Sequence, residues 1–149
     1  MVAAFEHVLV ATDGSPMADK ALELALRVAN GSRVTALTVV HDYGLPEYLH
    51  AAVRGRPDAQ LLREELLAEG RRLLGDAVAR VARDNTPVEQ QVVLSGKAPC
   101  HEIVAAASRQ GCDLIVMSSH GLGGRMAGLL GSQTQAVLSL AAVPVLVTR

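Results

Sequence analysis

Short β-branched segments alternate with segments of helical spacing along the whole of this 149-residue chain. Apolar runs typical of buried strands occupy residues 7–12, 33–40, 88–94, 112–118 and 143–148. Helical spacing of apolar residues fills the intervals at 16–30, 59–85, 98–111 and 132–140. This alternation predicts an α/β fold: one open, parallel, five-stranded sheet with right-handed crossovers and helices on both faces. We expect a single Rossmann-like domain over residues 1–149, with the strand order 3-2-1-4-5.

Turn and capping residues support these boundaries. Ser15 and Pro16 suit the N-cap and first position of the first helix, and the Asn-Gly pair at 30–31 suits its end. Asp58 is a natural cap for the long second helix. The connection 41–57 holds two prolines and two glycines, and its length is typical of a functional loop that is helical in part.

Composition excludes several classes of function. Half of the residues are hydrophobic but only three are aromatic, which predicts an aliphatic core. The net charge of −1, without a basic stripe, argues against nucleic acid as a partner. The N-terminus resembles no signal peptide, and no apolar run reaches membrane-spanning length, so we expect a cytoplasmic protein that contacts no membrane. The two cysteines lack CxxC spacing and are expected to be reduced thiols.

Polar residues follow the first and fourth predicted strands. In sheets of this order, ligands bind outside the carboxyl ends of the strands where the strand order reverses. Asp13 would lie there, although Asp-Gly-Ser is also ordinary turn chemistry. Opposite it, the fourth strand leads into a glycine-rich loop whose candidate residues are Ser118, Ser119, His120, Gly121, Gly123 and Arg125. These glycines permit close backbone approach to a ligand, or they mark a mobile loop. Arg125 could meet a phosphate or simply face water.

A second candidate feature is the Gly-Ser pair at 131–132, which opens the last helix. Ser132 is a good helix N-cap, and free amides at such a terminus can hold an anion. The chain has no P-loop, no dinucleotide fingerprint after the first strand and no GxSxG elbow. Its histidines lack metal-ligand spacing. No catalytic constellation is visible, and we expect a protein that is not an enzyme.

The chain resembles the universal stress proteins over essentially its whole length. The resemblance rests on "HVLVATDGSPMADKALELAL", "GKAPCHEIVAAASRQGCDLIVMSSHG" and "GLLGSQTQAVLSLAAVPVLVTR". The family's nucleotide-binding branch carries Gly, two residues, Gly, nine residues, and then Gly with Ser or Thr. Gly121, Gly131 and Ser132 fit that spacing, while Ser118 replaces the first motif glycine. Arg125 stands where the family usually has an apolar residue.

The resemblance implies an adenine nucleotide site for ATP, with Mg²⁺ as a companion ion. Asp13 and the Ala11–Thr12 backbone would meet the adenosine, with Val40 beside the adenine. Residues 118–121 would wrap the ribose and α-phosphate. The outer phosphates would lie at Gly131, Ser132 and Gln133.

The resemblance also implies a homodimer through the fifth strand and protein partners that the sequence does not identify. The leading hypothesis is an ATP-binding regulatory or stress-response protein with little or no hydrolysis. The Ser118 replacement favours an alternative, a dimeric interaction module of the same fold that binds no nucleotide. A third hypothesis, an enzyme of a related fold, lacks support because "ATDGSP" is not the Ser-Gly-Gly-x-Asp-Ser loop of the ATP pyrophosphatase-like ligases.

Overall fold

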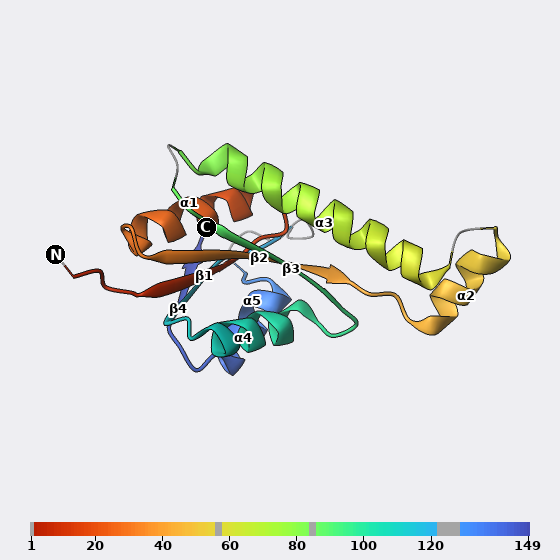
Figure 1. Cartoon of the computed structure of the whole chain (residues 1–149). Coiled ribbons are helices and arrows are strands. Elements are labelled where there is room, and N and C mark those ends of the chain that lie inside the picture. The colour runs from red at the N-terminus through yellow and green to blue at the C-terminus, as the bar shows by residue number, and fades with distance from the viewer. Residues whose placement is uncertain (1, 56–57, 84–85, 122–128) are drawn as a thin grey trace.

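The computed structural model describes residues 2–55, 58–83, 86–121 and 129–149. Its middle layer is a parallel five-stranded sheet in the order β3-β2-β1-β4-β5, which confirms the predicted order (Figure 1). The strands are β1 (His7–Ala11), β2 (Arg33–His41), β3 (Glu89–Ser95), β4 (Leu114–Ser118) and β5 (Val145–Thr148). The helices are α1 (Pro16–Ala29), α2 (Leu45–Val53), α3 (Ala59–Val81), α4 (Pro99–Gln110) and α5 (Ser132–Leu140).

The predicted caps form at α1 and α3. The Ser15 hydroxyl accepts a hydrogen bond from the Ala18 amide at 3.2 Å, which satisfies one of the free amides of the first turn of α1. Asn30 ends α1 in the left-handed conformation, with a φ of 47°. At α3, the Asp58 carboxylate accepts from the Leu61 amide at 2.8 Å.

Several element boundaries differ from the predicted ones. The second strand continues through His41, and the connection after it contains the helix α2. Helix α3 ends at Val81, earlier than the predicted 85, and residues 84–85 lie outside the described ranges. The fourth strand begins at Leu114 because Asp113 serves another role: its carboxylate accepts from the Glu6 and His7 amides at 2.8 and 3.0 Å.

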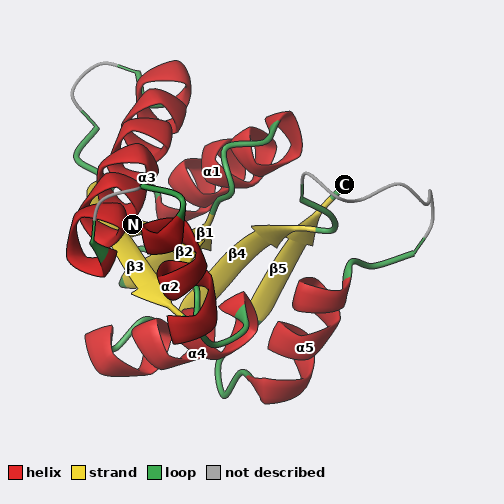
Figure 2. Cartoon of the chain, turned by 90° about the vertical axis from the view of Figure 1, so that its right-hand side faces the viewer, coloured by secondary structure: helices red, strands yellow, loops and turns green. Residues whose placement is uncertain are grey.

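Two apolar cores lie on opposite faces of the sheet, and Figure 2 shows α1 and α3 on one face and α4 and α5 on the other. Alternate residues of β1 divide between them: Val8 and Val10 pack toward α1 and α3, whereas Leu9 packs toward α4. Both faces are therefore buried, which explains the nearly continuous apolar runs of the inner strands. None of the helices in the described ranges combines the length and apolarity that a membrane crossing requires.

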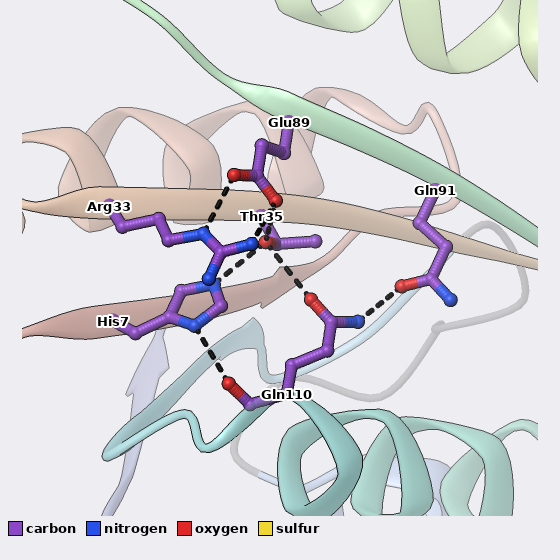
Figure 3. A network of polar contacts seen from close by, with 6 residues as sticks. All are labelled: His7, Arg33, Thr35, Glu89, Gln91 and Gln110. Carbon is purple, nitrogen blue, oxygen red and sulfur yellow. Dashed lines mark hydrogen bonds and ion pairs between the residues drawn. The ribbon is translucent and has the colours of Figure 1, made fainter.

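A polar network joins β1, β2, β3 and α4 at the amino ends of the strands (Figure 3). The His7 ring lies 2.8 Å from the Thr35 hydroxyl and 3.2 Å from the Gln110 carbonyl oxygen, which can only accept. Arg33 donates two hydrogen bonds to Glu89, at 2.7 and 2.9 Å. These contacts satisfy the buried His7 side chain.

Candidate functional site

A pocket of about 210 Å³ opens at the carboxyl ends of β1 and β4, where the strand order reverses. This is the position that the sequence predicts for a ligand. The described residues that line it come from six segments: Ala11, Thr12, Asp13, Ala18, Leu37, Val39, Pro99, Ile103, Met117, Ser118, Gly121, Gln133 and Thr134. Asp13 is the charged member of this set, and the rest supply hydroxyl groups, an amide and apolar surface.

The turn after β1 fixes Asp13 by local hydrogen bonds. The Asp13 carboxylate accepts from the Ser15 amide at 3.0 Å, and the Thr12 hydroxyl accepts from the Gly14 amide at 3.2 Å. Gly14 has a φ of 78°, a left-handed conformation that favours glycine. The Asp13 Oδ2 atom lies next to Gly121, so this side chain both closes the turn and borders the pocket.

Gly121 makes room for that carboxylate. A Cβ atom at residue 121 would lie 2.2 Å from Asp13 Oδ2, a distance that no side chain could occupy without displacing Asp13. The close approach of Asp13 therefore explains why residue 121 is a glycine. It lets the loop after β4 and the turn after β1 approach each other across the pocket.

Two serines at the carboxyl end of β4, its last residue Ser118 and the next residue Ser119, stabilise the loop that follows. The Ser118 hydroxyl donates to the His120 carbonyl at 2.7 Å, and the Ser119 hydroxyl lies 3.1 Å from His120 Nδ1. Ser118 is nearly buried, and its hydroxyl is directed at the chain beyond it. A serine is therefore accommodated where the family motif has its first glycine.

The first turn of α5 is held against the same loop. The Gly131 amide donates to the Ser119 carbonyl at 2.7 Å, and the Thr134 hydroxyl donates to the Ser118 carbonyl at 2.9 Å. Gly131 is the N-cap of α5 and Ser132 its first helical residue, so the prediction that Ser132 is the cap is wrong by one position. The first backbone amides of a helix have no partner within the helix. Because glycine has no side chain that could accept from them, the first-turn amides of α5 have no side-chain cap.

Gln133 joins the two helices that flank the pocket. Its side-chain oxygen accepts from the Cys100 amide in the first turn of α4 at 2.9 Å. The N-cap of α4, Ala98, also makes no side-chain hydrogen bond. The beginnings of α4 and α5 therefore lie together at one side of the pocket, with Pro99 and Gln133 in its wall.

The predicted site residues do not all reach the pocket. The structure places these in its wall: Ala11, Thr12, Asp13, Ser118, Gly121 and Gln133. Ser119, His120, Gly131 and Ser132 lie directly behind or beside that wall, in the loop contacts just described. Gly123 and Arg125 fall outside the described residues.

Val40 lies on the other face of the sheet. Its Cγ2 methyl group packs against Gly70 of α3, where an added Cβ atom would lie 2.7 Å from it. Val39, not Val40, lines the pocket. Successive side chains of a strand point to opposite faces, so a shift of one residue moves the side chain across the sheet.

Sequence reasoning missed the apolar floor of the pocket. Leu37 and Met117 lie at strand positions that face α4, and Ile103 faces them from that helix. Thr134 was missed as well, although it lies only three residues beyond Gly131. The strand alternation in β2 and β4 was the available signal for the floor. No group of three or more His, Cys, Asp or Glu side chains that could hold a metal ion occurs in the described parts of the chain.

The chain is similar to one family over nearly its whole length. The family model described as Universal stress protein family matches residues 4–149. The relative named Universal stress protein YxiE, from Bacillus subtilis (strain 168), is 31% identical, and the match covers 97% of this chain and 99% of the relative. Universal stress protein in QAH/OAS sulfhydrylase 3'region, from Thermus aquaticus, is 35% identical with the same coverage, 97% and 99%.

Solved structures show the same fold. The universal stress protein UspA from Lactobacillus plantarum has a TM-score of 0.79 at 25% identity, with 99% of this chain and 100% of that chain covered. A universal stress protein in complex with cAMP has a TM-score of 0.66 at 24% identity, covering 98% of both chains. The universal stress protein from Archaeoglobus fulgidus in complex with dAMP has a TM-score of 0.69 at 23% identity, covering 95% and 96%. For this chain, the last two establish the fold.

Proposed function

The chain belongs to the universal stress protein family, and from that premise we propose that it binds an adenine nucleotide at the β1–β4 pocket and acts as a regulatory protein. The observation that carries the proposal is the approach of Gly121 to the Asp13 carboxylate beside the uncapped start of α5. Two proteins of this fold were solved with an adenine nucleotide, cAMP or dAMP, which adds support.

The pocket suits the nucleoside part of the ligand. Its volume of about 210 Å³ lies below the roughly 300–1,000 Å³ of typical ligand pockets, so it would take part of a nucleotide. Leu37, Val39 and Met117 offer apolar surface to a base. The Asp13 carboxylate can accept from a ribose hydroxyl or from the exocyclic amino group of adenine.

The phosphates would lie outside the pocket, along the loop after β4 and the start of α5. Helix N-termini attract anions through free amides and the helix dipole, and the Gly131 N-cap makes no side-chain bond to those amides. ATP is the nucleotide that we propose, with Mg²⁺ brought by the phosphates. The bound nucleotide would shift the protein's conformation or its choice of protein partner, with little or no hydrolysis.

We propose that the functional unit is a homodimer formed through β5. The strand order places β5 at one edge of the sheet, where it pairs only with β4 among the described strands. Three of its four residues, Val145, Leu146 and Val147, are apolar and half-buried. Leu138 and Leu140 of the adjacent α5 are exposed at 44% and 48%. An apolar edge of this kind is normally covered, and a second copy of the strand would cover it.

The nucleotide proposal is tested first on the wild-type protein. The protein is purified without added nucleotide and denatured, the released small molecules are identified by mass, and the ligand-free protein is titrated with Mg-ATP by calorimetry. We expect a co-purified adenine nucleotide or a measurable heat of binding. A folded dimer that carries no nucleotide and gives no heat would favour the alternative of a dimeric interaction module.

Two variants connect binding to the site. Gly131→Val places its side chain 3.0 Å from the Ser119 carbonyl, and Gly121→Ala displaces Asp13. Because the displaced groups border the proposed site, we expect a loss of about 1–3 kcal/mol of binding free energy in each variant, which is roughly a 5- to 150-fold loss of affinity. Gly96→Ala is the matched control, because the atom nearest to its Cβ is the Asp42 carbonyl oxygen at 3.7 Å. Unchanged affinity in both site variants, with normal circular dichroism, would place the nucleotide elsewhere.

A further inference from the structure

A second hollow lies between α2 and α3, and it shares no lining residue with the β1–β4 pocket. Its volume is about 440 Å³, roughly twice that of the first pocket. Figure 1 shows α2 beside the start of α3, beyond the carboxyl end of β2. The described residues that line this α2–α3 groove are Tyr43, Glu47, Tyr48, Leu62, Glu65, Leu66 and Glu69.

Aromatic rings form one wall of the α2–α3 groove. Tyr48 is 4% exposed, and its hydroxyl donates to the Asp42 carboxylate just after β2. The Arg63 guanidinium carbon lies 4.7 Å from the centre of the Tyr48 ring, so that ring already stacks on a cation. Tyr43 is half exposed, and its ring makes an edge-on contact with the His41 ring at 5.4 Å between centres. The Tyr48 ring is therefore fixed and largely buried, and the Tyr43 ring is the accessible part of this wall.

The other wall is one face of α3. Leu62, Glu65, Leu66 and Glu69 follow helical spacing, so apolar and acidic side chains alternate along the groove. Arg72 donates to the Glu69 carboxylate at 2.9 Å, which balances that charge. Within the described part of the chain, Glu65 and Glu47 have no ion-pair partner, and the groove has no basic side chain in its wall.

The separation of these charges indicates the kind of ligand. The described carboxylates form no cluster of three that could coordinate a metal ion, and apolar side chains lie between them. A matching ligand carries positive charges that are separated by apolar chain. The two carboxylates without an ion-pair partner in the described ranges come from different helices, Glu47 from α2 and Glu65 from α3, and they line the groove together with tyrosines and leucines, which suits ammonium groups joined by an aliphatic chain.

We propose that the α2–α3 groove binds a linear aliphatic polyamine. The Tyr43 and Tyr48 rings and the leucines of α3 would cover its methylene groups, while the Glu47 and Glu65 carboxylates would neutralise its ammonium groups. Rings beside carboxylates favour organic cations over small inorganic ions, because the rings replace little of the hydration that an inorganic ion loses. Polyamine binding and nucleotide binding would then occupy separate places on one domain.

Spermidine is the probe for the test, titrated by calorimetry into ligand-free wild-type protein, because free nucleotide would itself bind the amine. We expect saturable binding that weakens as salt concentration rises. Glu65→Gln should weaken binding by about threefold, and Glu47→Gln with Glu65→Gln together by about tenfold. Glu64→Gln is the matched control, since Glu64 is an exposed neighbour on α3 outside the groove and should leave the affinity unchanged.

Three results would overturn the proposal. One is the absence of a binding heat at millimolar spermidine. Another is an equal loss of affinity in Glu64→Gln and Glu65→Gln, which would indicate non-specific attraction to an acidic surface. The third is binding of an oligolysine peptide without binding of spermidine, which would indicate a protein partner. Retained spermidine binding in Gly131→Val would show that the groove acts independently of the nucleotide site, whatever the outcome there.

Discussion

The Cys112 thiol, two residues before β4, is 4% exposed and belongs to the core between the sheet and α4. Burial raises its pKa from 9.0 to about 11, because a thiolate there would lose its hydration. In the unfolded chain the thiol would ionise at its ordinary pKa. A raised pKa in the folded state means that stability is fully present below about pH 9 and is lost as the pH rises toward 11.

This difference predicts an alkaline loss of stability that Cys112 causes. From about pH 7.5 to pH 10, the thiol should lower the free energy of unfolding by about 1.4 kcal/mol. Urea unfolding at both pH values, under reducing conditions, measures the change. Lysine and tyrosine also titrate in this range, so Cys112→Ala serves as the reference. If that variant lost as much stability as the wild type over the same range, the thiol would not be the cause.

Single residues also show what the sequence left undetermined at the site. The strand order and the motif spacing predict that the segments of Asp13 and Gly121 meet, and both residues line one pocket. The sequence predicts Val40 beside the ligand, whereas Val39 lines the pocket and Val40 packs against α3. Which valine faces the pocket depends on side-chain direction, and two adjacent valines do not differ in polarity. The Ser118 hydroxyl turned out to bond the His120 carbonyl, a contact that only the loop's three-dimensional path creates.

At the scale of elements, α3 packs tightly against the sheet at Gly70. A Cβ atom at this position would lie 2.7 Å from Val40 and 2.8 Å from Val92. Gly75, five residues further along the same helix, is open by comparison: its Cβ would meet only the Gln90 side chain, at 3.7 Å. The two glycines therefore separate two effects, the helix propensity that alanine adds and the crowding that it causes.

Alanine should act differently at these two positions. Gly75→Ala should raise stability by up to about 1 kcal/mol, since alanine favours the helix. Gly70→Ala gains the same helix propensity, but overpacking against the sheet costs about 1–3 kcal/mol. Its free energy of unfolding should therefore be lower than that of Gly75→Ala by about that amount. Thermal and urea unfolding of both variants would decide the question. Equal stabilisation of both would mean that α3 can move away from the sheet at little cost.

The elements themselves were largely predictable, because five apolar runs with helical intervals permit few arrangements. Helix α2 was less so, since the prolines and glycines of 41–57 break the helical pattern on both sides of a short segment. The α2–α3 groove was equally hard to predict from the sequence. Tyr48 and Leu66 are far apart in sequence, and their shared wall depends on how the two helices pack.

At the scale of the whole molecule, the free edge of β5 decides whether two copies can pair. Even-numbered residues of this strand bond to β4: the carbonyls of Pro144 and Thr148 accept from the Ile115 and Ser119 amides at 3.0 and 2.8 Å. In a parallel pair, residues between those positions direct their amide and carbonyl groups to the other side. Val147 therefore presents its backbone to the outer edge, where a second copy would bind.

Proline at two adjacent positions tests the proposed dimer. Val147→Pro removes an outward amide, which an edge strand tolerates, and it should give a folded protein of monomer mass by light scattering. Leu146→Pro removes an amide directed at β4 and should lower the melting temperature strongly, because a ladder bond inside the sheet is lost. A Val147→Pro protein that stays dimeric, with unchanged circular dichroism, would mean that the copies associate through another surface. In that case the exposed leucines of α5 would be the next place to look, since they lie beside β5 and need no free strand edge to pair.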